Sequence, residues 1–509
     1  MSSIDLSLVR LQQLVQHLPL YTRPTIHIAG TNGKGSVSAY LSHILASSQP
    51  PFKVGRYNSP HLVVVHDCIT IDNKPITPGA YNTERSLVEE ADKQHETALS
   101  SFELLTLTAF QIFEREKVDV AVVEVGMGGR LDATNILPTS VILASALTAV
   151  DLDHQAFLGP TVAHIAKEKA NIARPGRPFI IGRQKHPEVD SVVQDVVAEQ
   201  RGILLPSVQV SQREWDLDLD GEKPIFSLDP DKFEEPPHLP ISCHLPCFNG
   251  TLRTLLPLFG DHQLDNLGIA LGVISSLFTH VPEELALLDF PSKITLQSIG
   301  DGIRATRWPG RLSFHTIDIA TAGHKRAVVL LDGAHNSASS QTLSDYLVHI
   351  VSTLSRGPRH PTEKSTRALP PSPRRLRLTY ILALSHSPPK TPLETLSPLL
   401  PFRSPSADHS IQVTTRLALL RFTPPDGMPW VKSVSPSELR QVASLLAPDT
   451  ETWVASEAEN ENSGEQGCAD LSAALKWAVD GRHGEDDNLV VLAGSLYLVA
   501  DFYRLHEIQ

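Results

Sequence analysis

Cysteine is scarce in this sequence, with only four thiols among 509 residues. That number is too small for a disulfide scaffold in so long a chain, so we expect a reducing compartment. Cys243 and Cys247, with His244 between them, resemble half of a zinc site. No second pair of ligands follows at a suitable spacing, and we therefore interpret them as two partly buried thiols.

Long apolar runs and a targeting signature are absent as well. No run of about eighteen apolar residues occurs, which argues against a transmembrane helix. The N-terminus lacks a basic stretch followed by an apolar core. A glycine-rich motif begins at Gly30 and leaves little room for a transit peptide. These features predict a cytoplasmic protein.

An excess of positive charge is also lacking, since the formal net charge is -13. A net negative field repels phosphate polymers, so we expect neither nucleic acid nor an anionic membrane as a partner. Residues 356–375 are basic and proline-rich, but no aromatic side chains interleave their charges. We interpret them as a solvated, disordered insertion rather than a nucleic-acid site. Residues 456–467 resemble a second flexible loop, which is acidic.

What the sequence does contain is a regular alternation of apolar strands and amphipathic helices. One hydrophobic core does not extend over a chain of this length, so at least two domains are expected. The alternation predicts an α/β fold of two domains. Residues 1–300 would form a mainly parallel sheet with a P-loop-type ATPase core, and residues 301–509 a smaller Rossmann-like domain. Gly300-Asp301-Gly302 is interpreted as a loop before the boundary motif Trp308-Pro309-Gly310-Arg311.

The individual elements follow from apolar periodicity. Residues 203–250 are richer in proline and acid, and we expect irregular structure or short antiparallel strands there. The predicted strands are 25–29, 118–125, 141–149, 178–182, 327–331, 378–384 and 489–493, and the predicted helices are 6–15, 37–46, 102–113, 161–173, 264–277, 337–354 and 496–508.

The strongest local signal is the segment Gly30-Thr31-Asn32-Gly33-Lys34-Gly35-Ser36, between a predicted strand and a predicted helix. It departs from the strict Walker A pattern, because Gly35 separates Lys34 from Ser36 and Ile28 replaces the first glycine. Glycines let backbone N–H groups point at phosphate oxygens, the helix N-terminus adds partial positive charge, and Lys34 supplies a cation. The alternative is a tight turn with a solvent-exposed lysine.

Glu124 lies at the carboxyl end of the apolar run 118–125, where open α/β sheets bind ligands. A buried acid there needs a partner. Beside a triphosphate that partner would be magnesium, and the alternative is an ion pair with Arg130. Three glycines in residues 126–129 indicate a close backbone approach. Arg130 and Asp132 could form a structural ion pair or a substrate clamp.

Further candidates lie at corresponding positions. His154 follows the strand 141–149, and is either a ligand at the same sheet edge or a structural histidine. Lys169 is on a helix that should pack towards this edge, and either contacts a phosphate or carboxylate or faces solvent. Asp332 follows a buried strand, and either accepts hydrogen bonds from a ribose or adenine or caps the next helix.

Eight motifs together resemble the folylpolyglutamate synthase/dihydrofolate synthase family of the Mur ligase superfamily, and the resemblance extends from Leu8 to about His506. They are IHIAGTNGKGS (26–36), SPHL (59–62), EVGMGGRLDATN (124–135), DHQAFLGPT (153–161), IAKEKANI (165–172), GDHQLDN (260–266), WPGR (308–311) and DGAHN (332–336).

The resemblance implies roles for individual positions. Lys34, Lys169 and His154 are the catalytic candidates, and family members can carry the lysine at position 169 in carbamylated form. One departure from the family pattern is Asn171, where glycine is more common. The implied magnesium ligands are Ser59, Glu124 and His154, and the implied ATP contacts are Gly33, Lys34, Gly35, Ser36, Asn266, Arg311, Asp332 and His335.

The implied activity is a magnesium-dependent ligation that consumes ATP and passes through an acyl phosphate. The implied substrates are L-glutamate and 7,8-dihydropteroate, because residues 60–62, 67–75, 421–430 and 494–498 resemble eukaryotic, especially fungal, dihydrofolate synthases. Folylpolyglutamate synthase or a bifunctional enzyme is the alternative. A non-catalytic nucleotide-binding regulator and a cell-wall Mur ligase are further alternatives. We expect a monomer.

Overall fold

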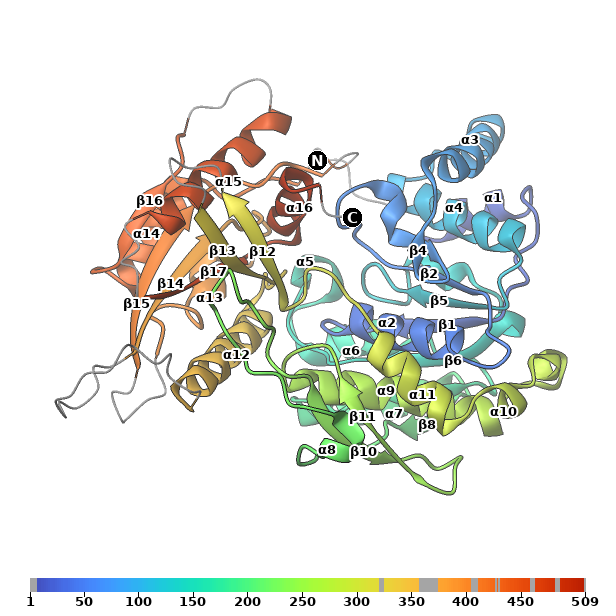
Figure 1. Ribbon diagram of the computed structural model, residues 1–509. Coiled ribbons are helices and arrows are strands. Elements are labelled where there is room, and N and C mark those ends of the chain that lie inside the picture. The colour runs from blue at the N-terminus through green and yellow to red at the C-terminus, as the bar shows by residue number, and fades with distance from the viewer. Residues whose placement is uncertain are drawn as a thin grey trace. The chain divides into compact units, whose positions relative to one another are not determined.

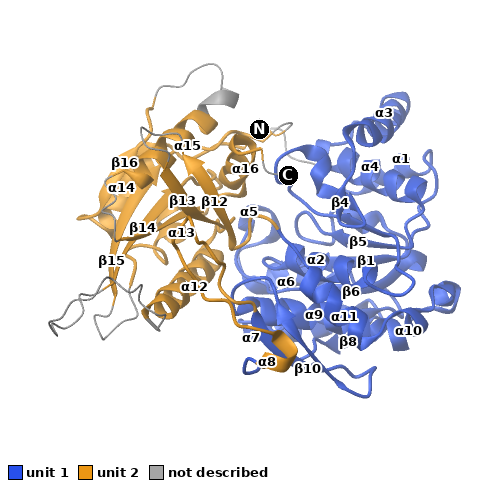
Figure 2. Ribbon diagram, viewed as in Figure 1, with its two compact units in different colours: residues 1–215, 239–308 blue, residues 216–238, 309–509 orange. Residues whose placement is uncertain are grey.

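The computed structural model describes residues 7–319, 325–356, 374–403, 411–425, 428, 431–457, 463–480 and 486–507. The chain divides into two compact units (Figure 2). Unit 1 contains residues 1–215 and 239–308, and unit 2 contains residues 216–238 and 309–509. The chain therefore passes between the units after Trp215, after His238 and after Trp308.

Unit 1 is built on an eight-stranded sheet with the strand order β4-β3-β2-β5-β1-β6-β7-β8. The six strands from β2 to β8 in this order are parallel, and β3 and β4 are antiparallel. A smaller antiparallel sheet has the order β11-β10-β9. The strands are β1 Thr25–Ala29, β2 Val54–Tyr57, β3 Ile69–Ile71, β4 Lys74–Pro75, β5 Val120–Glu124, β6 Ile142–Leu147, β7 Pro178–Ile181, β8 Ile203–Pro206, β9 Ser211–Gln212, β10 Leu239–His244 and β11 Thr251–Leu256.

Helices cover both faces of this sheet (Figure 1). The helices α2, α9 and α11 form one core with the strands, and α1, α3 and α4 form another. Burial on both faces explains the continuous apolar runs of β1, β5 and β6. The helices of unit 1 are α1 Val9–Val15, α2 Lys34–Ala46, α3 Pro78–His95, α4 Ser101–Glu116, α5 Gln155–Leu158, α6 Val162–Ala170, α7 Pro187–Glu199, α9 His262–Thr279, α10 Phe290–Lys293 and α11 Leu296–Ala305.

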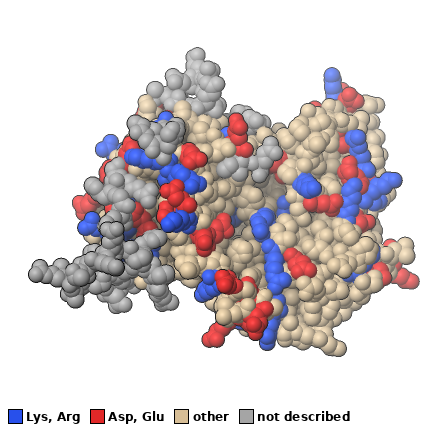
Figure 3. All heavy atoms as spheres, viewed as in Figure 1, with Lys and Arg blue, Asp and Glu red and all other residues tan. Residues whose placement is uncertain are grey.

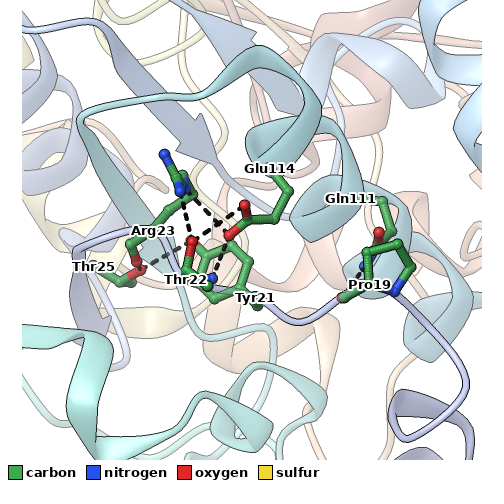
Figure 4. A network of polar contacts seen from close by, with 7 residues as sticks. All are labelled: Pro19, Tyr21, Thr22, Arg23, Thr25, Gln111 and Glu114. Atoms are coloured by element: carbon green, nitrogen blue, oxygen red, sulfur yellow. Dashed lines mark hydrogen bonds and ion pairs between the residues drawn. The ribbon is translucent and has the colours of Figure 1, made fainter.

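The chain leading into β1 is fixed by a polar network (Figure 4). Glu114 of α4 accepts hydrogen bonds from the backbone N–H of Thr22 and, at 3.2 Å, from Nε of Arg23. The hydroxyl of Tyr21 lies 2.9 Å from that of Thr25, the first residue of β1. These contacts fix the start of β1, and the glycine-rich loop follows directly at the other end of that strand.

The predicted loop Gly300-Asp301-Gly302 is wrong, because these residues lie inside α11. A Cβ atom on Gly302 would be 2.5 Å from Cα of Ile44 in α2, so glycine is required there for close helix packing. Thr295 caps the helix by accepting a hydrogen bond from the N–H of Ser298. In the sequence alone, a glycine that allows close packing of two helices cannot be distinguished from a glycine in a loop.

Unit 2 is a six-stranded sheet with the order β12-β13-β17-β14-β15-β16. All neighbouring strands are parallel except β12 and β13. With unit 1, this confirms the predicted α/β fold class with two mainly parallel sheets. The elements are α8 Leu217–Asp220, β12 Ser313–Ile319, β13 Lys325–Leu331, α12 Ser337–Arg356, β14 Arg374–Leu382, α13 Pro392–Leu396, β15 Ile411–Leu419, α14 Pro436–Leu446, β16 Glu451–Val454, α15 Ser463–Val479, β17 Asp487–Ala493 and α16 Leu496–Leu505.

Residues 216–238 belong to unit 2, although both flanking strands belong to unit 1. Asp231 forms an ion pair of 3.2 Å with Arg326 of β13. The rings of Phe226 and Phe233 lie 6.2 and 5.8 Å from that of Phe314 in β12. This segment, which we name the strap, is therefore attached to unit 2 by both aromatic and ionic contacts.

The two predicted insertions lie largely outside the described residues, which omit 357–373 and 458–462. Their predicted ends are corrected: Arg374 and Arg375 begin β14, and Ser463 begins α15. Among the described residues, no single helix is long and apolar enough to cross a membrane, and only the bent pair His262–Thr279 and Glu283–Lys293 meets the criteria jointly. On the face drawn in Figure 3, basic and acidic side chains are interspersed.

Candidate active site

The glycine-rich segment forms a loop between β1 and the N-terminus of α2, as predicted. Gly30 and Gly33 adopt φ values of +149° and +95°, which glycine tolerates best. A Cβ atom on Gly30 would be 1.8 Å from Oγ1 of Thr148. The same hydroxyl donates a 2.6 Å hydrogen bond to the carbonyl of Asn32. The loop is thus held against the end of β6, and Lys34 is the first residue of the helix.

Lys34 points into the structure rather than into solvent. Its Nζ lies 3.6 Å from Oε1 of Glu124 and donates a 3.3 Å hydrogen bond to the carbonyl of Thr31. Glu124 ends β5, is buried, and accepts a 2.6 Å hydrogen bond from Nδ2 of Asn58. The alternative of a solvent-exposed lysine is therefore wrong. The predicted alternative partner of Glu124, Arg130, instead pairs with Glu168 at 3.0 Å.

The residues at this edge fit a hard divalent cation. Oγ of Ser59 is buried and has no hydrogen-bond partner among the described residues, and Glu124 offers a buried carboxylate oxygen nearby in the fold, because β2 and β5 are neighbours. Hydroxyl and carboxylate oxygens are ligands that Mg²⁺ accepts, together with phosphate oxygens. His154 is exposed in the turn after β6 with a φ of +51°. In the described part of the chain, no three His, Cys, Asp or Glu side chains form a metal site by themselves.

Lys169 is buried in α6, so the predicted alternative of a solvated helix face is wrong. Its Nζ donates a 2.8 Å hydrogen bond to the carbonyl of Gly30, the first residue of the glycine-rich segment 30–36, which we name the phosphate loop. Burial, and next the charge of Lys34, lower the pKa of Lys169 to about 7. A large fraction of this amine is therefore neutral at neutral pH, which makes it a nucleophile.

The loop after Glu124 is organised by Asp132 rather than by an Arg130–Asp132 ion pair. Asp132 accepts hydrogen bonds from the N–H of Met127 at 2.8 Å and from the hydroxyl of Thr134 at 2.5 Å. That hydroxyl lies 2.8 Å from Nε2 of His27 in β1. Burial raises the pKa of Asp132 and lowers that of His27 to about 3. Sequence analysis missed His27, because one histidine in an apolar strand resembles an ordinary core residue.

Asn266 of α9 packs against the phosphate loop. A Cβ atom on Gly33 would be 2.2 Å from its Oδ1. Its Nδ2 donates a 3.1 Å hydrogen bond to Gln263, whose own amide donates a 3.2 Å hydrogen bond to Oγ of Ser36. The structure therefore brings together three predicted ATP contacts. Gln263, which joins them, was not predicted, although it belongs to the GDHQLDN motif.

In unit 2, the predicted contacts Arg311, Asp332 and His335 lie on two turns that pack together. The carboxylate of Asp332 accepts hydrogen bonds from the N–H groups of Leu312 at 2.9 Å and Ala334 at 2.8 Å. Nδ1 of His335 lies 2.8 Å from the carbonyl of Gly333. A Cβ atom on that glycine would be 2.7 Å from Nη1 of Arg311.

One predicted alternative, that Asp332 caps α12, is wrong. Asn336 caps the helix instead, because its Oδ1 accepts a 2.9 Å hydrogen bond from the N–H of Ser339. Burial raises the pKa of Asp332, and the positive charge of Arg311 opposes that effect. The aspartate is thus used to join the two turns that carry Arg311 and His335.

A cavity of about 200 Å³ begins at His335 in unit 2. It lies at the carboxyl end of β14, the strand-end position where ligands of parallel sheets bind. Its polar lining consists of His335, Ser385, His386, Lys390, Thr391, Thr395 and Glu438.

Comparison with known proteins gives consistent relatives. Residues 365–505 match the sequence model of a family described as dihydrofolate synthetase, C-terminal domain. The chain is 31% identical over 508 residues to the dihydrofolate synthetase of Saccharomyces cerevisiae, covering 99% of this chain and 98% of that one. It is 29% identical to the probable dihydrofolate synthetase of Schizosaccharomyces pombe, covering 98% of each.

Solved structures share the fold. The folylpolyglutamate synthase of Mycobacterium tuberculosis, complexed with ADP and AMPPCP, is 26% identical with a TM-score of 0.69, covering 99% of this chain and 96% of that one. A bifunctional folylpolyglutamate synthase/dihydrofolate synthase with Mn, AMPPNP and L-glutamate bound is 22% identical with a TM-score of 0.67, covering 99% and 95%. From its phosphate loop and the extent of these similarities, the chain belongs to the folylpolyglutamate synthase/dihydrofolate synthase family, with fungal-type relatives.

Proposed function

We propose that this chain joins L-glutamate to 7,8-dihydropteroate, with ATP as co-substrate, and so forms dihydrofolate, ADP and phosphate. The observation that carries the proposal is the contact of Lys34 with Glu124 at 3.6 Å, directly after a glycine loop that opens a helix. This arrangement supports triphosphate binding at the carboxyl edge of the sheet. Sequence identity of 31% over 98% of the length of a dihydrofolate synthetase supports the choice of substrates.

The residues of unit 1 divide the chemistry among them. The N–H groups at the start of α2 and the ammonium group of Lys34 bind the β- and γ-phosphates and offset their charge. The carboxylate of dihydropteroate attacks the γ-phosphorus, and ADP leaves. The glutamate amine then attacks the carbonyl carbon of the acyl phosphate, and phosphate leaves. The carboxylate of Glu124 forms an ion pair with the ammonium group of Lys34 at 3.6 Å, which keeps Lys34 oriented.

Ser59, Glu124 and His154 would hold the magnesium ion. The buried Oγ of Ser59, which has no hydrogen-bond partner in the described part of the chain, and the buried carboxylate of Glu124 support this assignment. His154 lies in the turn after β6, and β6 is on the other side of β1 from β5 in the strand order. When bound, the cation would neutralise phosphate charge and help to align the γ-phosphate. Loss of activity in EDTA, with recovery when Mg²⁺ is added, would support a magnesium site. If Ser59→Ala had wild-type activity at every Mg²⁺ concentration, the assignment of Ser59 as a ligand would be contradicted.

The nucleotide and glutamate contacts of unit 2 are also proposals. Arg311, Asp332 and His335 would contact ATP, as Asn266 would in unit 1. The cavity lined by His335 is a candidate site for glutamate, since Lys390 and His386 are also among its lining residues and their side chains can bind carboxylates. Lys390→Ala should raise the KM for glutamate more than the KM for ATP. An equal rise in both KM values would contradict the assignment of glutamate to this cavity.

The decisive experiment compares dihydropteroate with tetrahydrofolate, each with ATP, Mg²⁺ and L-glutamate. Product formation from dihydropteroate alone identifies a dedicated dihydrofolate synthase. Turnover of both identifies a bifunctional enzyme, and turnover of tetrahydrofolate alone contradicts the proposal. ATP binding without turnover of any pterin would indicate a nucleotide-binding regulator, and turnover of a peptidoglycan precursor would indicate a cell-wall ligase.

Two further properties are proposed for the chain as a whole. All four cysteines are free thiols, which supports a cytoplasmic, reducing environment. Fractionation of the source cells tests that location. We also propose a monomer, which light scattering at assay concentration would contradict if it gave twice the mass of one chain. Unit 1 would serve as the ATP-binding domain and unit 2 as the ligase domain.

A further inference from the structure

Arg56 is a buried cation that the proposed mechanism does not use. It lies in β2 with an exposed fraction of 6%. Its Nη1 donates a 3.3 Å hydrogen bond to the hydroxyl of Ser42 in α2. Its Nε has no hydrogen-bond partner among the described residues. A guanidinium group so poorly satisfied by hydrogen bonds is costly to bury and needs another source of stabilisation.

Trp308 supplies part of that stabilisation, beside the charge of Glu124. The guanidinium carbon of Arg56 lies 5.0 Å from the centroid of the indole ring, which is within the range of a cation–π contact. Burial lowers the pKa of Arg56 to about 10, and the charge of Glu124 opposes that effect. At neutral pH the arginine is therefore charged, and it can attract the face of the ring.

The same indole packs against the phosphate loop. A Cβ atom on Gly35 would be 2.4 Å from Cζ2 and 3.0 Å from Nε1 of Trp308. Gly35 therefore has no room for a side chain, and the ring takes the space that a side chain would occupy. Gly35 belongs to the first turn of α2, so the ring packs against the turn whose N–H groups are the proposed phosphate donors.

Trp308 also occupies a special place in the chain. It is the last residue of unit 1, and the turn that carries Arg311 follows it in unit 2. Its ring packs on the core formed by α2, α9 and α11. One side chain therefore anchors both the phosphate loop and the end of the connecting segment within unit 1.

We propose that Arg56 and Trp308 are positioning residues that hold the phosphate loop in its ATP-binding shape and fix the point at which the connecting segment leaves unit 1. The inference rests on the proposed function, since it assigns ATP phosphates to this loop. Arg56 orients the indole through its face, and the indole restrains Gly35. Neither side chain touches the reacting atoms.

The test uses the full-length enzyme with Trp308→Leu and Arg56→Met, singly and together, and the conservative variants Trp308→Phe and Arg56→Lys. The matched control is Trp477→Leu, which removes a similar stack in unit 2, where Arg416 lies 3.8 Å from the ring centroid. Calorimetric titration with ATP alone measures nucleotide affinity, steady-state kinetics gives the KM for each substrate, and thermal melting reports stability.

We expect Trp308→Leu and Arg56→Met each to weaken ATP binding by about tenfold. The KM for dihydropteroate should change little. Trp308→Phe should recover much of the affinity, and Arg56→Lys only part of it, because an ammonium group lacks the planar face that stacks. The double variant should lose less than the product of the two single effects, since the residues act through one contact. The control should retain wild-type ATP affinity.

The inference is overturned if Trp308→Phe and Arg56→Lys, which conserve the fold best, bind ATP no better than the two severe variants. It is also overturned if the severe variants raise all KM values equally, or if the two single effects multiply. Failure of the proposed function is distinguishable, because the wild-type protein would then form no product from dihydropteroate, whatever the state of this pair.

Discussion

The phosphate loop of unit 1 and the Asp332–Asn336 turn of unit 2 are both connections from a strand end to a helix. Each follows a buried parallel strand and opens a helix. In unit 1, Lys34 is the first residue of its helix, pairs with Glu124, and is the proposed phosphate ligand. In unit 2, the carboxylate of Asp332 is used internally, because the N–H groups of Leu312 and Ala334 donate to it. In unit 2 the charged side chain at this strand end therefore holds together the turns that carry the proposed ATP contacts Arg311 and His335, whereas in unit 1 the charged side chain is itself the proposed phosphate ligand.

The substitution Lys34→Ala tests the proposed role of the unit 1 loop most directly, and we expect it to have the largest effect. Loss of one charge at the developing phosphoryl centre should lower kcat by at least about 100-fold. Stability should be largely retained, because the buried Glu124 keeps its hydrogen bond from Asn58. Steady-state kinetics and urea unfolding measure the two quantities, and near wild-type turnover would show that the loop does not bind the triphosphate.

Glu124→Gln tests the anionic partner in the same unit. The amide oxygen can still accept the hydrogen bond from Asn58, which is 2.6 Å long in the native protein. The charge that attracts a divalent cation is lost, so the Mg²⁺ concentration for half-maximal activity should rise by at least about tenfold. A Mg²⁺ titration of initial rates measures it, and an unchanged midpoint would assign the metal to other ligands.

Burial and the charge of Lys34 lower the pKa of Lys169 to about 7, and we therefore expect activity to depend on pH around that value. Carbamylation joins the neutral amine to CO₂ and releases a proton, so acid opposes it. Between about pH 6 and 8 the neutral fraction of such an amine rises about tenfold. We expect bicarbonate-dependent activity that falls as pH falls through 7, and the mass of one added CO₂ on Lys169. Lys169→Met should remove the bicarbonate dependence, and a wild-type rate indifferent to bicarbonate would contradict the modification.

Asp332→Asn tests whether the turn in unit 2 is mainly structural. One side of an amide cannot accept a hydrogen bond, so the N–H of Leu312 or Ala334 loses its partner. The free energy of unfolding should fall by about 1–3 kcal/mol, and the KM for ATP should rise a few-fold. Chemical denaturation checks the first effect. Unchanged stability with a large loss of turnover would make Asp332 a functional group like Lys34.

The smallest effect is expected for Arg130→Met. The ion pair of Arg130 with Glu168 is half exposed, so its loss should cost less than about 1 kcal/mol. A rise in the KM for dihydropteroate without a change in stability would instead identify Arg130 as a substrate clamp. Arg85→Met, in a comparably exposed pair with Glu89, is the matched control.

Local features of the site were predictable from the sequence, and features created by packing were not. The phosphate loop and Glu124 follow from a glycine pattern and from the end of an apolar run, both of which are local signals. Gly302 was misread because a glycine that allows helix contact looks like a loop glycine. The roles of Gln263, Asn336 and the Arg56–Trp308 pair depend on which elements become neighbours, and no periodicity encodes that.

The strap has a practical consequence for anyone who wishes to express the halves separately. A fragment ending at Trp308 would carry residues 216–238 without the strands on which they pack. Phe226 and Phe233 would then be presented to solvent, and Arg326 of the other fragment would lose Asp231. To express each unit intact, residues 216–238 must be removed from the N-terminal fragment and joined to the C-terminal fragment. A single cut after Trp308 leaves both fragments incomplete.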